Sequence, residues 1–398
     1  MPKLLRILPE FFKTAITLFA VSCTFPTPIA SGQQRVLGDP LPGLTAEQFR
    51  AFQNGKIEFQ AIEQVADGLG PIFNRNSCAA CHSNPALGGA SKIMTTRFGK
   101  ATNGSFDPLS SLGGSLLQER AIDPLGVETI PAQANVTAFR QTTALFGLGL
   151  IEAIPDATIL KGVRTKPVNG VLGKASIVQD VVSGQSRVGR FGWKAQQATI
   201  LAFAGDAYLN EMGITNRLFP SENAPNGNTA LLKQLDKVAD PEDQTDPVTG
   251  KAGIDLNSDF MRLLAPPVPQ ALTTSTAFGA MFFVSTGCSD CHTPSMKTGP
   301  SPITPINLKA IYLYSDLLLH DMGTLGDGIV QGNADAREMK TPPLWGVSTS
   351  APYLHDGRAA TLDEAIQAHD GEGAFAKNHY LKLTSDQQKL LIEFLKSL

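Results

Sequence analysis

The sequence predicts helices joined by long irregular loops, with one small β-hairpin, arranged in two related halves. Helix-capping patterns precede apolar stripes near both ends of the chain, and 37 glycines and 27 prolines among 398 residues indicate many loops. Hydrophobic residues make up 42% of the chain and charged residues 17%, which is typical of a globular protein and excludes extensive disorder. The net charge of −3 gives no indication of a basic surface for a nucleic-acid partner.

The amino-terminal half begins with a predicted helix and continues mainly in loops. Thr45 and Gln48 form a capping box, and helix-forming residues follow to about Ala66. Residues 83–130 are rich in Gly, Ser, Asn and Pro, so we expect loops there. Over 168–193, Val and Ile alternate with Gly and polar residues, which predicts the hairpin.

A proline cluster at 265–269 is the predicted boundary between an amino-terminal domain, 36–264, and a carboxy-terminal domain, 265–398. The two parts also share a weak internal similarity. The pattern Thr-x-x-Leu-aromatic-Gly occurs at 142–147 and again at 341–346. Such a repeat indicates two related halves.

Three helices are predicted in the carboxy-terminal half. A short apolar helix occupies 276–286, and the last helix begins at about Ser385. Between them, a capping box at Thr361 begins a helix with one inward face. The residues on that face are Leu362, Ala365, Ile366 and His369.

The first residues of the chain, 1–22, are predicted to be an export signal. Basic residues precede a short apolar core at 15–21, which is too short to span a bilayer, and small residues allow cleavage after Ser22. The next residue is Cys23, so a lipid anchor at this cysteine is an alternative to simple release. We therefore expect a periplasmic protein, either free or anchored.

Two motifs share the pattern C-x-x-C-H: Cys78-Ala79-Ala80-Cys81-His82 and Cys288-Ser289-Asp290-Cys291-His292. In this pattern the two thiols form thioethers with the vinyl groups of a haem, and the adjacent histidine ligates its iron. A shared zinc site is disfavoured because the motifs are far apart in the sequence, and a redox dithiol needs no following histidine. The motifs therefore predict two covalently attached c-type haems.

The second axial position of each iron decides between electron transfer and catalysis. His369 is the first candidate for one haem, because a neutral imidazole that faces a core needs a partner. His320 together with Met322 is a second candidate pair. After His82 the only nearby soft ligand is Met94, for which an ordinary core or loop methionine is the favoured interpretation. The first haem is therefore expected to lack a protein ligand at this position, and such a site binds water, peroxide or oxygen.

Residues 352–366, PYLHDGRAATLDEAI, resemble the carboxy-terminal motif of bacterial dihaem cytochrome c peroxidases. Four further segments resemble the dihaem oxidoreductase, or thiol-oxidoreductase-like, subfamily: GPIFN at 70–74, RFGWKA at 190–195, DLLLHDMG at 316–323 and TPPLWG at 341–346. The resemblance implies a mainly α fold of two cytochrome c-like haem domains. It also implies that the carboxy-terminal haem passes electrons to the amino-terminal haem, where hydrogen peroxide is reduced.

The resemblance assigns an axial ligand to the second haem and includes one departure from the family. In the peroxidases, a methionine fourteen positions after the histidine of the P-Y-x-H-D-G motif ligates the electron-transfer haem. Here that motif histidine is His355, and the residue fourteen positions later is His369. Two histidines would then ligate this iron, and its potential would be lower than with a thioether. His355 itself is expected to line a haem pocket or the domain interface.

The resemblance also suggests two catalytic residues. The peroxidases place a catalytic glutamate in a Glu-Met-Gly segment about twenty residues after a tryptophan that lies between the haems. Here Glu211 begins such a segment eighteen residues after Trp193. A carboxylate above an open haem can take a proton from peroxide and return it to the leaving oxygen. A solvated acid and an ordinary core tryptophan are the alternatives, and Glu152, which has apolar flanks, is the second candidate for the glutamate.

Three functions remain open from the sequence. The first is a peroxidase that receives electrons from a small redox protein, either a cytochrome c or a cupredoxin. The second is a dihaem oxidase that modifies a partner protein, and the third is an electron carrier without catalysis. The resemblance also leaves open a calcium ion between the domains.

Overall fold

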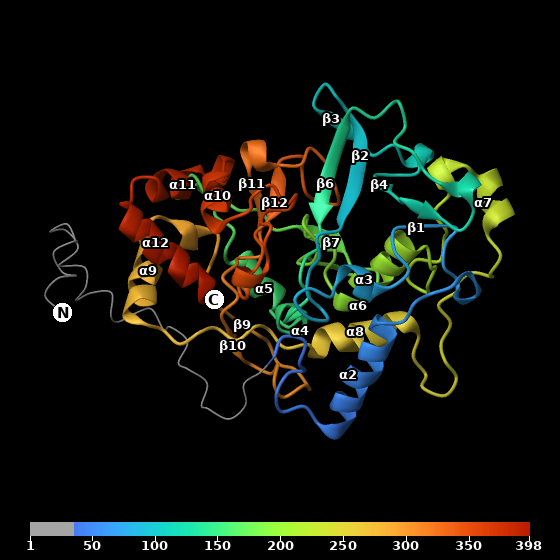
Figure 1. Cartoon of the computed structure of the whole chain (residues 1–398), viewed down its shortest axis with the longest axis horizontal. Coiled ribbons are helices and arrows are strands. Elements are labelled where there is room, and N and C mark those ends of the chain that lie inside the picture. The colour runs from blue at the N-terminus through green and yellow to red at the C-terminus, as the bar shows by residue number, and fades with distance from the viewer. Residues whose placement is uncertain (1–35) are drawn as a thin grey trace, which may run out of the picture. The chain divides into compact units, whose positions relative to one another are not determined.

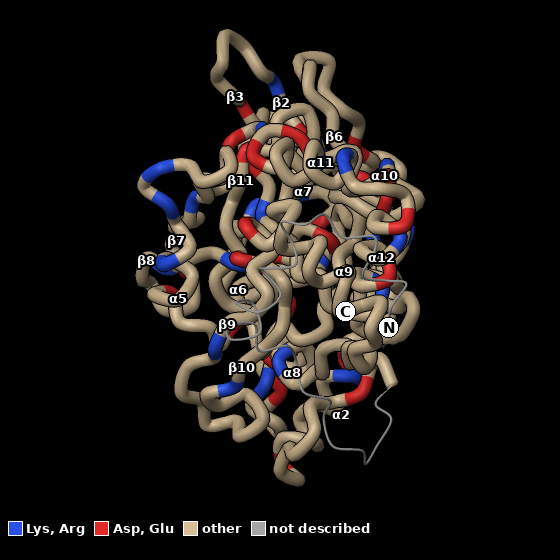
Figure 2. The backbone as a smooth tube through the Cα atoms, turned by 90° about the vertical axis from the view of Figure 1, so that its left-hand side faces the viewer, with Lys and Arg blue, Asp and Glu red and all other residues tan. Residues whose placement is uncertain are grey.

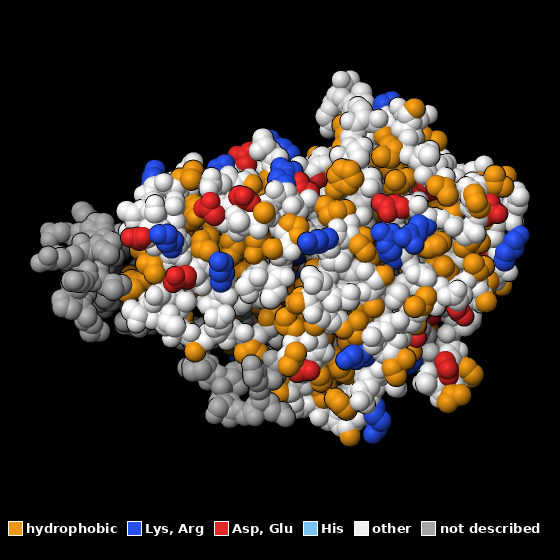
Figure 3. Space-filling model, viewed as in Figure 1, with side chains coloured by type: hydrophobic (Ala, Val, Ile, Leu, Met, Phe, Trp, Pro, Cys, Tyr) orange, Lys and Arg blue, Asp and Glu red, His pale blue; other side chains and the backbone are white. Residues whose placement is uncertain are grey.

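The computed structural model describes residues 36–398 (Figure 1). The predicted export signal and Cys23 lie outside the described residues. Among the described helices, none has the length and apolar character needed to cross a membrane. Basic and acidic residues are interspersed along the backbone (Figure 2). Exposed hydrophobic side chains are scattered among polar ones on the face drawn in Figure 3.

Among the elements of the described part of the chain, helices outweigh strands, and most of the helices are short. The α-helices are α2 (Ala46–Phe59), α3 (Cys78–Cys81), α4 (Leu148–Glu152), α5 (Asp156–Leu160), α6 (Ile200–Ala207), α7 (Thr229–Leu235), α8 (Gly253–Leu263), α9 (Thr274–Ser285), α10 (Leu362–Gln367), α11 (Ala374–Tyr380) and α12 (Ser385–Lys396). A π-helical turn, Tyr208–Met212, continues α6. Single 3₁₀ turns include Cys288–Asp290 and Gly371–Gly373.

Capping chemistry explains where three of the predicted helices begin. The side chains of Thr45, Thr361 and Thr384 each accept the backbone N–H three residues later, as in a capping box. The first helix ends at Phe59, earlier than expected. The predicted helix with the inward face also ends early, at Gln367, so His369 lies just beyond the cap residue of α10.

The strands form small antiparallel sheets, and one of them corrects the sequence-based expectation. The strands are β1 (Ile72–Phe73), β2 (Met94–Thr102), β3 (Ser105–Asp107), β4 (Leu116–Leu117), β5 (Arg120–Ala121), β6 (Val136–Gln141), β7 (Ile177–Gln179), β8 (Ser186–Val188), β9 (Met296–Lys297), β10 (Ala310–Ile311), β11 (Leu319–Asp321) and β12 (Glu338–Lys340). The predicted hairpin is present as β7 and β8. Residues 83–130, however, are not loops throughout, because β2 pairs with β3, β4 and β6.

The same helix pair occurs twice along the chain. In the first pair, α2 packs on α8, and a Cβ atom at Gly55 would lie 2.2 Å from the Leu256 carbonyl oxygen. In the second pair, α9 packs on α12, and a Cβ atom at Gly279 would lie 2.1 Å from the Leu390 carbonyl oxygen. In each pair the glycine allows the backbones to approach closely. The helices α2 and α9 each precede a C-x-x-C-H motif, so these pairs support the segments that carry the motifs.

Replacing Gly279 with valine should therefore destabilise the protein. The side chain cannot fit against the α12 backbone, and overpacking of this kind costs about 1–3 kcal/mol of unfolding free energy. Chemical denaturation checks the value, with the exposed Thr274→Val in the same helix as the control. Equal stability of the two variants would contradict the close approach.

Candidate functional site

The first C-x-x-C-H motif forms the single turn of α3, which ends at His82. The His82 N–H donates to the Cys78 carbonyl at 3.0 Å, and both cysteines are free thiols. Burial raises the pKa of Cys78 to about 12 and that of Cys81 to about 11. Both thiols are therefore protonated at neutral pH. A reactive dithiol requires a thiolate, so this environment does not favour that alternative.

The second motif repeats this geometry. The His292 N–H donates to the Cys288 carbonyl at 3.0 Å, and Cys288 and Cys291 are free thiols. Burial again raises the pKa of both thiols, that of Cys288 to about 11. The two motifs thus present the same set of groups, which is two neutral thiols and a following histidine.

The two motif histidines are neutral, and in each the Nε2 lone pair is available to a metal ion. The Nδ1 atom of His82 lies 3.1 Å from the Gly89 carbonyl, and that of His292 lies 3.0 Å from the Tyr314 carbonyl. A carbonyl only accepts, so Nδ1 carries the proton in each ring and Nε2 keeps its lone pair. Burial lowers the pKa of both histidines to about 4, so the rings are neutral at neutral pH. This tautomer is the one that a metal-ligating histidine uses.

His369 is arranged in the same way and lies near His292. Its Nδ1 atom donates to the Ala365 carbonyl at 2.8 Å, and burial lowers its pKa. After burial itself, repulsion from His369 is the largest cause of the low pKa of His292. Gly373 lies against the His369 ring, because a Cβ atom there would be 3.1 Å from it.

One large pocket connects these groups. It is lined mainly by apolar side chains together with Cys288, Cys291, His292 and His369. Its wall continues to residues 84–90, which follow the first motif. The pocket therefore extends from the second motif toward the first.

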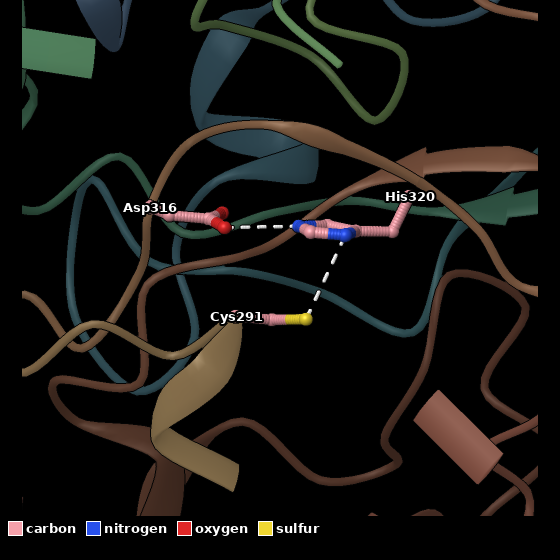
Figure 4. A group of neighbouring side chains, drawn as sticks. All are labelled: Cys291, Asp316 and His320. Atoms are coloured by element: carbon pink, nitrogen blue, oxygen red, sulfur yellow. Dashed lines mark hydrogen bonds and ion pairs between the residues drawn. The ribbon is translucent and has the colours of Figure 1, made fainter. Parts of the chain in front are cut away.

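His320 forms hydrogen bonds with two carboxylates beside the second motif, and Figure 4 shows its contacts with one of them, Asp316, and with Cys291. Its Nε2 lies 2.9 Å from Asp316 Oδ2, its Nδ1 lies 2.7 Å from Glu372 Oε2, and Cys291 Sγ is 3.6 Å from Nδ1. Burial alone would lower its pKa, but the hydrogen bonds to Asp316, Cys291 and Glu372 outweigh burial and raise the pKa to about 12. The ring is therefore a cation with both nitrogens occupied. As an iron ligand, His320 would have to give up one of these ion pairs, so the alternative pair with Met322 is less favourable than His369.

The ion pairs of His320 make a pH-dependent contribution to stability. Its pKa is higher in the folded protein than in the unfolded chain, so the stabilisation is complete below about pH 6.5 and declines as the pH rises toward about 12. His320→Gln removes the cationic partner of the buried Asp316 and of the half-buried Glu372, which keep only their backbone N–H donors, and should cost about 3–5 kcal/mol at pH 6.5 and less at pH 9. Denaturation at both pH values tests this, with His379→Gln on α11 as the control. A loss that does not change with pH would contradict the cationic assignment.

Glu211 lies in the π-helical turn after α6 and is fastened to the segment before the first motif. Its Oε2 accepts a hydrogen bond from Asn74 Nδ2 at 2.8 Å, and its backbone carbonyl accepts from the N–H groups of Asn74 and Arg75 at 2.8 and 3.1 Å. Burial raises the pKa of Glu211, and the charge of Arg97 partly opposes this rise. After burial, Glu211 is the largest cause of the raised pKa of Cys81. The structure therefore brings Glu211 close to the first motif.

Two further buried charges accompany Glu211. Burial lowers the pKa of Arg97 to about 10, and burial raises that of Asp206 to about 6. Each of the two residues shifts the pKa of the other, and both interact electrostatically with Glu211. Among the described residues, no hydrogen-bond partner is present for the buried Arg97 Nε.

Glu152, the second candidate for the catalytic glutamate, uses its carboxylate to hold helices together. Its Oε2 lies 2.7 Å from Arg262 Nε, and its Oε1 accepts the N–H of Ile200 at 2.7 Å. These contacts attach α4 to α8 and to the first residue of α6. They leave Glu152 less suited to proton transfer than Glu211.

Trp193 lies in the pocket wall and links segments from both parts of the chain. Its Nε1 donates to the Gln141 carbonyl at 2.9 Å, and its own carbonyl accepts the N–H of Lys340 at 2.9 Å. Its ring meets the buried His355 edge to face, with centroids 6.2 Å apart. Met94 begins β2 and pairs with Gln141 in the sheet.

Residues 130–398 match the model of a protein family described as di-haem oxidoreductase, putative peroxidase. The chain belongs to this di-haem oxidoreductase family. It is accordingly an oxidoreductase that uses two haems.

Individual relatives of this di-haem oxidoreductase are distant. Over 182 residues it is 26% identical to the cytochrome c peroxidase Ccp of Escherichia coli (strain K12), which covers 44% of this chain and 38% of that protein. The match thus spans well under half of the curated relative. Among solved structures, hydrazine synthase of Kuenenia stuttgartiensis is 16% identical with a TM-score of 0.43, covering 94% of this chain and 100% of that one. A MauG-like protein associated with microbial copper homeostasis is 16% identical with a TM-score of 0.42, covering 95% of each chain.

The residues present in this di-haem oxidoreductase fit two covalent haems. Each motif supplies two neutral free thiols and a neutral imidazole, and the pocket at the second motif is mainly apolar and contains a second neutral imidazole. Apolar walls suit the haem macrocycle, and a neutral imidazole is one of the axial ligands that haem iron accepts.

Sequence reasoning missed Arg97, Asp206 and the carboxylate partners of His320. Arg97 lies on β2, in the stretch expected to be loops, and its strand partner β6 is distant in sequence. Asp206 lies on α6, five residues before Glu211, and the helical pattern alone gives no reason to select it. Burial was the missing information in each case.

Proposed function

We propose that this di-haem oxidoreductase reduces hydrogen peroxide at a haem attached through Cys78 and Cys81 and ligated by His82. The second haem, attached through Cys288 and Cys291, would deliver the electrons. The observation that carries the proposal is the placement of Glu211, a buried carboxylate with a raised pKa, beside the first motif. A simple electron carrier has no need of such a group.

The proposed role of Glu211 is proton transfer. Asn74 holds Oε2, so Oε1 is the oxygen that would take a proton from peroxide and return it to the leaving oxygen. Burial brings the pKa of this carboxyl closer to neutral pH, where a group is an effective general base and acid. The nearby Arg97 keeps the carboxylate available by opposing that rise. The haem, when bound, supplies the redox chemistry at an iron with an open coordination position.

The proposed electron path runs from the second haem past Trp193. Its indole lies in the wall of the pocket that reaches from the second motif toward the first. The hydrogen bond from Nε1 to the Gln141 carbonyl holds the ring in place, and the Lys340 N–H holds the Trp193 backbone carbonyl. His292 and His369 would both ligate the second iron through Nε2, which gives a bis-histidine haem.

The proposed domains, location and electron donor are those expected from the sequence. We propose an amino-terminal haem domain over 36–264 and a carboxy-terminal haem domain over 265–398, each built on one of the two glycine-mediated helix pairs. The proposed location is the periplasm, where a small redox protein of the cytochrome c or cupredoxin type would donate electrons. A lipid anchor at Cys23 belongs to the same proposal.

Titration of the fully reduced protein with hydrogen peroxide under anaerobic conditions tests the function. Rapid reoxidation that consumes one peroxide for every two electrons is expected. Slow reoxidation, no faster than that of free haem, would contradict a peroxidase and favour a carrier. Covalent oxidation of side chains in an added protein at the expense of peroxide, as opposed to electron loss from a redox donor, would instead indicate a modifying oxidase.

A further inference from the structure

Lys340 is a buried lysine that faces the pocket at the second motif. It ends β12, opposite Leu319 of β11, and only 8% of its surface is exposed. It lines the same pocket as Cys288 and His369. Among the described residues, the one hydrogen-bond acceptor of its Nζ is the Thr341 carbonyl at 3.4 Å, and no carboxylate oxygen lies within ion-pair distance of it.

The other fully buried cations in the described chain are treated differently. Lys194 forms an ion pair with Asp327 at 2.9 Å and donates to the Asp335 and Glu338 carbonyls at 3.0 and 2.7 Å. Arg190 pairs with Asp156 and donates to the Ile154 carbonyl at 2.6 Å. Each of these two buried cations therefore has a carboxylate partner, which Lys340 lacks.

An ammonium group without such a partner is costly to bury, by several kcal/mol. Burial lowers the pKa of Lys340 to about 8, which still leaves most of the amine protonated at neutral pH. The nearest acid that influences it is Asp316, and this carboxylate is already bonded to His320 and to the Leu318 N–H. An anion from outside the chain is therefore needed to complete the site.

We propose that Lys340 Nζ binds a propionate carboxylate of the second haem. This inference rests on the proposed attachment of that haem at Cys288 and Cys291. A haem carries two carboxylates on an otherwise apolar ring, and the pocket offers mainly apolar walls with two lysines, the buried Lys340 and the half-buried Lys377, of which Lys340 is the one enclosed without a carboxylate. Because the Lys340 N–H also donates to the Trp193 carbonyl, the same residue would join the haem edge to the proposed electron path.

The expected consequence is a raised midpoint potential of the second haem. Ferric haem carries one more positive charge than ferrous haem, so a nearby ammonium disfavours the oxidised form. Lys340→Met should therefore lower this potential, whereas Lys340→Arg should keep it near that of the wild type. The control is Lys174→Met. Lys174 is partly exposed, and its Nζ lies 2.6 Å from Oε2 of Glu338, which belongs to β12 like Lys340.

Spectroelectrochemistry of the intact dihaem protein measures the potential of each haem separately, and the haem content is measured in parallel. An unchanged second-haem potential in Lys340→Met with full haem content would overturn the proposal. A shift confined to the first haem would also overturn it. A wild-type potential that depends on added acetate at constant ionic strength would assign Lys340 to a diffusible anion instead.

A second measurement covers the case in which the methionine variant does not fold. Wild-type protein with ¹³C-labelled haem propionates is compared with Lys340→Arg by redox-difference infrared spectroscopy. A labelled carboxylate band that moves in the variant supports the contact, and identical bands contradict it. Peroxide reduction is not needed for either readout, so the failure of the peroxidase function and the failure of this contact are distinguishable.

Discussion

Replacing Glu211 with glutamine is expected to slow peroxide reduction by about 10²–10⁴-fold, the range that a general acid–base group supplies. Glutamine keeps the size of the side chain and can still accept the hydrogen bond from Asn74 Nδ2. It cannot take up the proton of peroxide, so the loss should appear in the chemical step. Stopped-flow reoxidation of the reduced protein measures that step, and the absorption spectra of both haems should be unchanged.

Glu152→Gln is the matched control for this experiment. Glu152 is also a partly buried glutamate, but its carboxylate binds Arg262 and the Ile200 N–H. Its replacement should lower stability and leave the rate constant for peroxide within a few-fold of the wild type. A normal rate in Glu211→Gln would remove Glu211 from the mechanism. A large loss in Glu152→Gln alone would assign the role to Glu152.

Replacing His369 with methionine is expected to raise the midpoint potential of the second haem substantially. Axial ligands set haem potentials over a range of roughly 0.8 V, and thioether ligation lies above imidazole ligation in that range. The Nδ1 of His369 donates to the Ala365 carbonyl, so the native ring is oriented to offer Nε2. A potentiometric titration monitored by absorption measures the change.

His379→Met provides the comparison for the axial ligand. His379 lies on α11, stacks on Phe375 and donates through Nδ1 to the Phe375 carbonyl at 2.9 Å. Its replacement should leave both haem potentials unchanged. If His369→Met also leaves them unchanged, His369 does not ligate the iron and another residue must be sought.

Local patterns in the sequence predicted the parts of the fold that depend on neighbouring residues. The capping boxes at Thr45 and Thr361 located the helix starts, because their hydrogen bonds span only three residues. The hairpin of β7 and β8 was predicted because its strands are adjacent in the chain. The strand β2 was missed since it is polar in composition and pairs mostly with β6, about forty residues later.

The residues of the candidate site also fall into those that could be predicted from neighbouring residues in the sequence and those that could not. The two C-x-x-C-H motifs are contiguous, so their thiols and histidines could be selected from sequence alone. The environment of His320 could not, because Glu372 is distant in sequence and its hydrogen bond arises only in the folded chain. Lys340 is an ordinary lysine in the sequence, and only its burial beside the pocket distinguishes it.

Low-temperature EPR of the purified ferric protein tests the central claim, one open haem and one bis-histidine haem, most directly. The account predicts a high-spin signal from the haem at His82 beside a low-spin bis-imidazole signal from the haem at His292 and His369. Half-reduction should remove the signal of one haem, the one of higher potential, and leave that of the other. Two low-spin signals in the ferric protein, with a low-spin signal remaining after half-reduction, would mean that both irons are closed, which would contradict catalysis at the first haem.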